Sequence, residues 1–394
     1  MMRKRILITL FSLATLMSLV VPAPLITEAS ESARLAPQAG RRSEPRPRPK
    51  ADSTDETDAD QRGQKKKAEK TQDEQGRPAE TPSQEVVQLA AELVSVPVVV
   101  FDKKGNLFTN LKKENFTVYE DDIKQDIVTF STAEAPLTMV ILVEFSKILF
   151  NYDTREKLIY PAGIFATRLM KPGDYVAVVA YDIRPKVLND FTSNTNEVLN
   201  SVNLLIRNFP AFSEANLFDA LKFVLMGGTV DEESYKGLDE VEGRTSVLLV
   251  STGLDTFSKI NFDEARKIVA NAGVPIYAIG VAELTYLMLE PYLSGPARLD
   301  FLQAQNQLRT FAESSGGRVY NIRFIGELNS VLDSITAMMR NEYVIGYAPS
   351  NPRREGKRRK IKVLVDVDGD GKPDNKNLEV QHRQQYIEPK APKK

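Results

Sequence analysis

Four short apolar runs, separated by stretches of helical periodicity, constrain the fold of this chain most strongly. An almost wholly apolar run is typical of a strand that is buried on both faces of a sheet. The runs are LTMVILVE (137–144), DYVAVVAYD (174–182), TSVLLVST (245–252) and VPIYAIGVA (274–282). Because helical patterns lie between them, the sequence predicts an α/β fold over residues 136–340, a doubly wound and mostly parallel sheet with helices on both faces.

Two β-rich stretches, residues 85–135 and 341–390, flank this unit. Each has alternating apolar and polar residues in about three short segments, which is the pattern of half-buried strands. Three strands alone offer too little apolar cover for independent stability. We therefore expect the two stretches to pair with each other and to form one small β-sandwich from both ends of the chain.

The first 29 residues have the pattern of an export signal. MMRKR supplies the positive start, and ILITLFSLATLMSLVV supplies an apolar run that small residues follow. An uncleaved membrane anchor is the alternative, although the run is short for a membrane span. Residues 30–84 contain no aromatic residue and are rich in charge, which predicts a disordered linker. Either interpretation predicts a secreted, periplasmic or cell-surface protein.

Composition narrows the chemistry further. The chain has no Cys, so disulfides, thiol catalysis and thiolate zinc sites are excluded. Its one His, His382, has no catalytic pattern around it. The 52 basic and 53 acidic residues nearly balance, so no global charge excess indicates a nucleic-acid partner.

Three motifs follow the predicted strands in order: MVILVEFSK, ANLFDAL and VLLVSTGLDTFSK. With them, the α/β segment resembles the von Willebrand factor type A domain, and the whole order resembles bacterial secreted proteins that carry such a domain between β segments. The resemblance implies that the three motifs meet at the carboxyl ends of the strands. In the family, this meeting point holds one divalent metal ion in a metal-ion-dependent adhesion site.

The metal ligands of the family are altered at most positions here. Glu144 replaces an Asp, Ser146 matches a Ser, Ile148 replaces a second Ser, Ala215 replaces a Thr, and Thr252 replaces the Asp before Gly253. Magnesium needs a near-octahedral shell of oxygen ligands, and these residues supply few. We therefore predict a degenerate site without a required metal, although Asn216 or Asp255 could substitute as ligands. The alternative role is structural: Glu144, Ser146 and Thr252 would hydrogen-bond one another and the loop amides.

A second candidate metal site lies near the C-terminus, in DVDGDGKPDNKN (366–377). Asp366, Asp368, Asp370 and Asp374 have a spacing that resembles calcium loops of the thrombospondin type 3 and EF-hand kinds. Asn377 stands where an EF-hand has a bidentate Glu. The alternative is a polar hairpin turn, for which Asp-Gly steps are ordinary. Calcium is therefore the one candidate cofactor.

Two functions remain open. The first is an exported, non-enzymatic binding or scaffold protein that presents the face of Glu144, Ser146, Asn216, Thr252 and Asp255 to a protein partner in the cell envelope or outside the cell. The second is a surface glycan hydrolase that uses Glu144 and Asp255 as paired carboxylates. The basic stretch RREGKRRK (353–360) predicts a solvated loop or attraction to anionic polymer or lipid headgroups.

Overall fold

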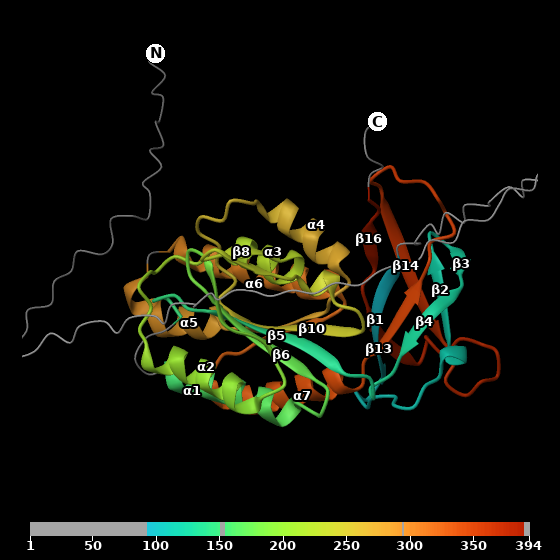
Figure 1. Ribbon diagram of the computed structural model, residues 1–394, viewed down its shortest axis with the longest axis horizontal. Coiled ribbons are helices and arrows are strands. Elements are labelled where there is room, and N and C mark those ends of the chain that lie inside the picture. Colours follow the sequence, from blue (N-terminus) through green and yellow to red (C-terminus); the bar gives the residue numbers. More distant parts are fainter. Residues whose placement is uncertain (1–92, 150–153, 294, 390–394) are drawn as a thin grey trace, which may run out of the picture. The chain divides into compact units, whose positions relative to one another are not determined.

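The computed structural model describes residues 93–149, 154–293 and 295–389 (Figure 1). The expected signal segment and linker, residues 1–84, lie outside the described residues. Among the helices of the described ranges, none combines the length and the apolar character needed to cross a membrane.

The α/β unit is built on a six-stranded sheet in the order β12-β11-β10-β5-β6-β7. All neighbours in it are parallel except β6 and β7. The strands are β5 (Leu137–Glu144), β6 (Tyr175–Tyr181), β7 (Pro185–Thr192), β10 (Arg244–Ser251), β11 (Ile276–Gly280) and β12 (Arg318–Asn321). β10 is buried along its whole length, which explains the apolar run VLLV (247–250) within it. The predicted doubly wound, mostly parallel sheet is confirmed.

Helices cover both faces of this sheet (Figure 1). One face packs against α1 (Thr154–Leu169), α2 (Thr195–Arg207) and α7 (Leu328–Arg340), and the other against α3 (Leu217–Met226), α4 (Phe262–Ala272) and α6 (Ala297–Ser315). The sequence pattern did not predict α5 (Ala282–Leu289) or the small hairpin of β8 (Gly228–Val230) and β9 (Glu233–Tyr235). Both are too short to carry a clear periodicity.

The flanking β stretches form two four-stranded sheets that share one core. The first has the order β15-β1-β13-β4, and the second has the order β16-β14-β2-β3. Their strands are β1 (Val94–Asp102), β2 (Phe116–Glu120), β3 (Ile123–Gln125), β4 (Ile127–Ser131), β13 (Tyr343–Tyr347), β14 (Arg358–Val365), β15 (Leu378–His382) and β16 (Gln385–Ile387). β1 pairs with β13 and β15, and β14 pairs with β2, so each sheet combines strands from both ends of the chain. The predicted β-sandwich is confirmed.

Two short β segments are each divided into two strands. Residues 123–131 form β3 and β4, and residues 377–387 form β15 and β16. In both cases the two halves belong to different sheets of the sandwich. A break of one or two residues turns the chain from one sheet to the other, which lets a short segment contribute to both.

Candidate functional site

The candidate site lies where the strand order of the α/β sheet reverses. β5 and β10 are neighbours at the centre of the sheet, and the connections that leave them run to opposite sides. Open α/β sheets bind ligands in the crevice outside the carboxyl ends of such strands. Glu144 ends β5 and Ser251 ends β10, so these two side chains define the site.

Glu144 is the centre of a buried hydrogen-bond network. Its side chain is 1% exposed. Its Oε1 accepts from the Ser146 hydroxyl at 2.7 Å. Its Oε2 accepts from the Ser251 hydroxyl at 2.9 Å, and from the Thr252 amide and hydroxyl at 2.8 Å each. The structural role considered for Glu144, Ser146 and Thr252 is therefore present, and four donors satisfy the carboxylate.

Sequence reasoning missed two members of this network, Ser251 and Tyr181. The Tyr181 hydroxyl donates to the Ser251 hydroxyl at 2.8 Å, and Ser251 also accepts from the Gly253 amide at 2.8 Å. Tyr181 ends β6 in direct register with Glu144 on β5. The signal available in the sequence was that two predicted parallel strands, which end at the same edge, both end in a polar residue.

Burial governs the protonation of this network. Desolvation raises the pKa of Glu144, while the hydrogen bonds from Ser146, Thr252 and Ser251 act in the opposite direction. Desolvation and the nearby Glu144 charge together raise the pKa of Tyr181 well above its usual value. Tyr181 thus stays a neutral hydrogen-bond donor at physiological pH.

Asn216 is buried beside this network and joins three loops. Its amide group donates to the carbonyl oxygens of Ile183 at 2.9 Å and Phe257 at 3.1 Å. Its Oδ1 accepts from the Phe257 amide at 3.0 Å. Asn216 therefore fixes the backbone of the β6–β7 turn and of the loop after β10 against the start of α3.

Asp255 holds the same loop against α3. Its Oδ1 accepts from the Phe218 amide in the first turn of α3 at 3.0 Å and from the Ser258 hydroxyl at 2.6 Å. Asp219 on α3 accepts in turn from the Lys259 amide of this loop at 2.8 Å. Burial raises the pKa of Asp255. A carboxylate at a helix N-terminus is electrostatically favourable, so the position of Asp255 has a structural explanation.

The donor set does not fit a divalent metal ion. Oε2 of Glu144 already accepts three hydrogen bonds. Ile148 and Ala215 offer no side-chain oxygen. Asn216 Oδ1 and Asp255 Oδ1 accept hydrogen bonds from the amides of Phe257 and Phe218. Because Mg²⁺ gives up its water shell only for a well-formed set of oxygen ligands, we derive no role for a metal at this site.

Apolar side chains project from the loops that this network holds. Phe257 is 70% exposed, Phe212 is 42% exposed and Ile183 is 38% exposed. The Phe212 carbonyl accepts from the Lys147 amide at 2.8 Å, which ties its loop to the end of β5. The site thus consists of a closed polar layer beneath exposed aromatic and aliphatic groups, an arrangement suited to contact with another protein.

The C-terminal acidic loop brings three carboxylates together. Oxygens of Asp366, Asp368 and Asp374 all lie within 4.8 Å of one another. Asp366 accepts from the amides of Gly369 and Gly371 at 2.8 Å each, in a turn where both glycines have positive φ. Three carboxylates this close could hold one metal ion, and calcium, which takes six to eight oxygens in flexible geometry, would need further ligands.

Asp370 differs from the other three carboxylates of this loop. It lies outside their cluster and accepts from the Lys372 amide at 2.8 Å. Its other oxygen lies 3.7 Å from Lys372 Nζ. Of the four Asp residues singled out by spacing, three thus lie close together, and Asp370 is the natural control.

Comparisons with known proteins found similarity only at a low level. No family model matches the sequence, and no curated protein matches it. Solved structures that match include proximal thread matrix protein 1 from the mussel byssus with a zinc-occupied adhesion motif, at 12% identity over 56% of this chain and 49% of that chain, with a TM-score of 0.40. The chain thus spans about half the length of that protein.

Two bacterial structures also match. A von Willebrand factor type A protein from Catenulispora acidiphila has 11% identity over 76% of this chain and 75% of that chain, with a TM-score of 0.39. BatB from Bacteroides thetaiotaomicron has 14% identity over 52% of this chain and 100% of that chain, with a TM-score of 0.36. Similarity at this level carries no conclusion about activity or partners.

The topology defines the class of protein. A central, mostly parallel sheet in the order β12-β11-β10-β5-β6-β7, with an antiparallel edge strand and helices on both faces, gives residues 137–340 the doubly wound α/β fold that the resemblance to the von Willebrand factor type A domain led us to expect. In this chain a β-sandwich from both flanking segments accompanies that domain.

Proposed function

We propose that this chain is an exported, non-enzymatic binding or scaffold protein. Its partner would be a protein of the cell envelope or the extracellular space, bound at the carboxyl-end face of the type A-related domain. The observation that carries the proposal is the exposure of Phe257, Phe212 and Ile183 on loops that buried hydrogen bonds hold in place. Rigid, exposed aromatic groups lose little entropy on binding and are frequent energetic centres of protein interfaces.

The same geometry argues against the hydrolase. A glycosidase needs two carboxylates that flank the scissile bond. Glu144 is buried and its oxygens accept four hydrogen bonds, so it does not reach a glycan. Asp255 accepts a hydrogen bond from the Phe218 amide in the first turn of α3. One member of the nominated pair, Glu144, is therefore inaccessible, and we favour binding over hydrolysis.

Capture from envelope extract with matched variants tests the proposal. The variant is Phe257→Asp with Phe212→Asp, and the control is Tyr175→Asp, an equally drastic change at a 47%-exposed residue at the opposite end of β6. A protein captured by the wild type and the control, but not by the double variant, is then purified and titrated. We expect the double variant to bind it at least about tenfold more weakly, because a central aromatic contact contributes ~2 kcal/mol.

Two results would overturn the proposal. One is that all three proteins capture the same set. The other is that chelator removes the interaction, which would require a metal at the strand ends.

A further inference from the structure

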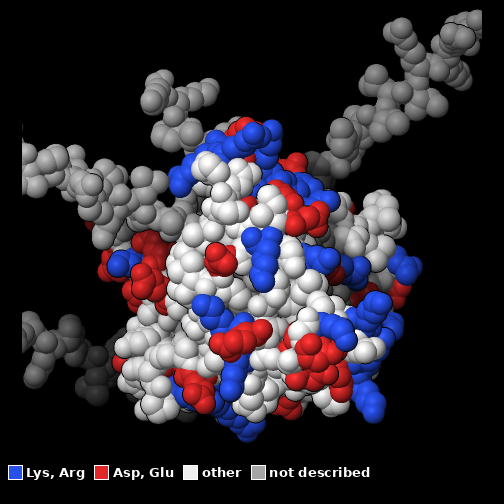
Figure 2. Space-filling view, turned by 90° about the vertical axis from the view of Figure 1, so that its right-hand side faces the viewer, with Lys and Arg blue, Asp and Glu red and all other residues white. Residues whose placement is uncertain are grey.

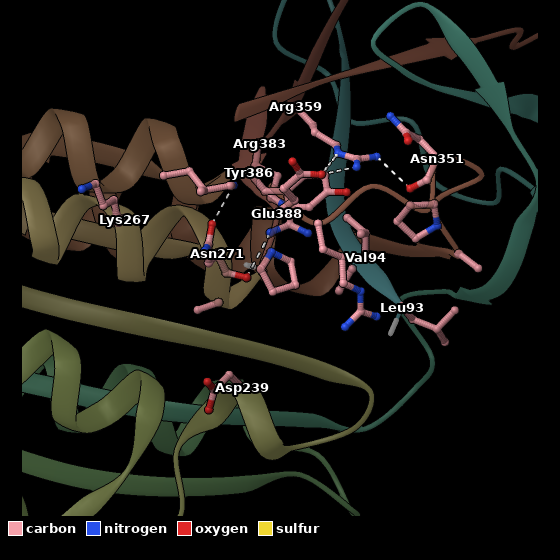
Figure 3. Close-up of a pocket in the computed structure, with 18 of the residues that line it drawn as sticks. Leu93, Val94, Asp239, Lys267, Asn271, Asn351, Arg359, Arg383, Tyr386 and Glu388 are labelled. Carbon is pink, nitrogen blue, oxygen red and sulfur yellow. Dashed lines mark hydrogen bonds and ion pairs between the residues drawn. The ribbon is translucent and has the colours of Figure 1, made fainter. Parts of the chain in front are cut away.

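A pocket of about 670 Å³ lies between the sandwich and the amino-terminal edge of the α/β sheet. Its walls come from the start of β1, the ends of α3 and α4, the 3₁₀ turn η3 (Leu238–Glu240), the loop between β13 and β14, and residues 383–389 (Figure 3). Figure 3 shows Arg383, Tyr386 and Glu388 at its centre, with Lys267 and Asn271 on α4 and Asp239 on the far wall. This pocket is separate from the face of Phe257, which lies at the carboxyl ends of the strands.

Arg383 lines this pocket without a carboxylate partner among the described residues. Its side chain is 2% exposed. Its Nη1 donates to the α4 carbonyl oxygens of Ala270 at 3.1 Å and Asn271 at 3.3 Å, and its guanidinium carbon lies 5.6 Å from the Tyr386 ring centroid. Its Nε has no hydrogen-bond partner among the described residues. A buried guanidinium normally pairs with a carboxylate, since an uncompensated buried charge is costly.

The nearby carboxylates are already taken by a different arginine. Arg359 forms ion pairs with Glu120, at 2.6 Å, and with Glu388. Glu120 also accepts from the hydroxyls of Tyr347 and Tyr386 at 2.8 Å each. Burial lowers the pKa of Arg383 to about 10, so it remains charged at neutral pH. The positive charge of Arg383 therefore faces the pocket without a counter-ion from this chain's described residues.

The rim of the pocket adds more positive charge. Arg359 and Glu388 of the lining pair with each other, and the other charged side chains of the lining are Lys267, Arg353, Arg354 and Arg383 against Asp239. The loop between β13 and β14 supplies Arg353 and Arg354, and Figure 2 shows Lys and Arg side chains gathered along the upper edge of this side of the molecule. Clefts lined by one sign of charge concentrate ligands of the opposite sign.

The lining also has apolar groups that reach solvent. Leu93 is 44% exposed and Met226 is 47% exposed, and the lining also includes Pro349, Pro352 and Pro389. A ligand that matches this lining carries both carboxylates and apolar side chains. A peptide has both, whereas an anionic polysaccharide has no apolar side chains to place against Leu93 and Met226.

We propose that this pocket binds an acidic peptide segment of a partner protein. One carboxylate pairs with Arg383 in the floor, others pair with Lys267 and Arg353 at the rim, and apolar side chains pack on Leu93 and Met226. A charge-assisted bond to a desolvated guanidinium gives the pocket selectivity for carboxylate over amide.

The test is a fluorescence-anisotropy titration of the full chain with a labelled peptide EELEEL and its neutral counterpart QQLQQL. We expect EELEEL to bind at least about tenfold more tightly, because only it can neutralise the buried and rim cations. The rim variant is Lys267→Glu with Arg353→Glu. Its control is Lys360→Glu with Lys362→Glu, which changes charge equally at exposed positions of β14 outside the pocket.

We expect the rim variant to weaken EELEEL binding by about tenfold or more and the control by less than about twofold. Arg383→Met should also lose the preference for EELEEL over QQLQQL, and its melting temperature reports folding separately. Four results would overturn the proposal: no EELEEL binding by the wild type, equal binding of both peptides, equal weakening by rim variant and control, or tighter binding of polygalacturonate or phosphatidylglycerol vesicles than of EELEEL.

Discussion

Thr252 gives Glu144 two hydrogen bonds, one from its amide and one from its hydroxyl, and both are 2.8 Å long. In the family that the sequence resembles, these two positions are Asp residues that help to hold a metal ion. Here Thr252 presents two donors to Glu144 where the family has a second carboxylate. An ionised carboxylate only accepts hydrogen bonds, whereas a hydroxyl can donate one to the Glu144 carboxylate.

Removal of Glu144 should destabilise the fold. Glu144→Ala leaves the buried hydroxyls of Ser146, Ser251 and Thr252 and one amide without their acceptor. Because each buried unsatisfied group costs ~1–3 kcal/mol, we expect the free energy of unfolding to fall by about 3–5 kcal/mol. Glu144→Gln keeps one acceptor and should cost about 1–2 kcal/mol. Urea denaturation measures both, with the exposed Glu134→Ala as control; a loss below about 1 kcal/mol for Glu144→Ala would contradict the network's role.

Magnesium and manganese should not bind at the strand ends. Isothermal titration calorimetry is best done on the variant Asp368→Asn with Asp374→Asn, because this variant removes two of the three clustered carboxylates of the C-terminal acidic loop. We expect no heat of binding at either ion, since Glu144 already accepts four hydrogen bonds and Ala215 offers no oxygen. A micromolar affinity in this variant would show that the network opens to accept a metal.

Calcium should stabilise the C-terminal loop. Without a cation, the carboxylates of Asp366, Asp368 and Asp374 repel one another at close range. We expect calcium at a hundredfold excess over its dissociation constant to add ~2.7 kcal/mol of stability and to raise the melting temperature by a few degrees. The measurement is a thermal melt with calcium and with chelator.

The loop itself provides the matched control for the calcium experiment. Asp368→Asn removes a clustered carboxylate and should abolish the calcium effect. Asp370→Asn changes the neighbour that lies outside the cluster and should retain most of it. Equal responses of the two variants, or no response of the wild type, would leave residues 366–377 as an ordinary turn.

Stability should rise as pH falls toward 5, because of Glu342. This residue is fully buried just before β13, where the Tyr277 hydroxyl donates to its Oε2 at 2.9 Å. Burial raises the pKa of Glu342 from 4.5 to about 7, although the Arg244 charge opposes the change. An acid whose folded pKa is raised stabilises the fold below its unfolded pKa, and this stabilisation is lost as pH rises through about 7.

Urea denaturation between pH 5 and pH 8 checks this, with Glu342→Gln as the comparison. The difference in free energy of unfolding between wild type and variant should shift in favour of the wild type by up to about 3 kcal/mol as pH falls. Parallel pH profiles for the two proteins would show that Glu342 does not titrate in this range.

Most elements of the fold could be predicted from the sequence. The apolar runs that form β5, β6, β10 and β11 predict buried strands, because a strand covered on both faces of a sheet needs no polar face. Period-two alternation likewise identified the flanking strands. The need of each β stretch for a covering layer predicted that they would pair, because apolar faces of three strands are not stable in water.

The candidate site was only partly predictable. The ends of β5 and β10 follow from the order of strands and helices, so Glu144 and Thr252 could be placed together. Tyr181 and Ser251 carry no distinguishing pattern, and their hydrogen bond joins residues 70 positions apart. Asn216 looked like a substitute ligand, yet in the structure it fixes the backbone at Ile183 and Phe257.

What the sequence by itself determined is therefore the type and order of the elements, since local periodicity directly reflects which side of each element is buried. Only the tertiary structure decided which polar groups meet. Thr252 donates to Glu144, Arg359 pairs with both Glu120 and Glu388, and Arg383 lines a pocket with its Nε unpaired among the described residues. The physical reason is that hydrogen bonds and ion pairs depend on distances of about 3 Å between residues far apart in the chain, and no local pattern encodes such distances.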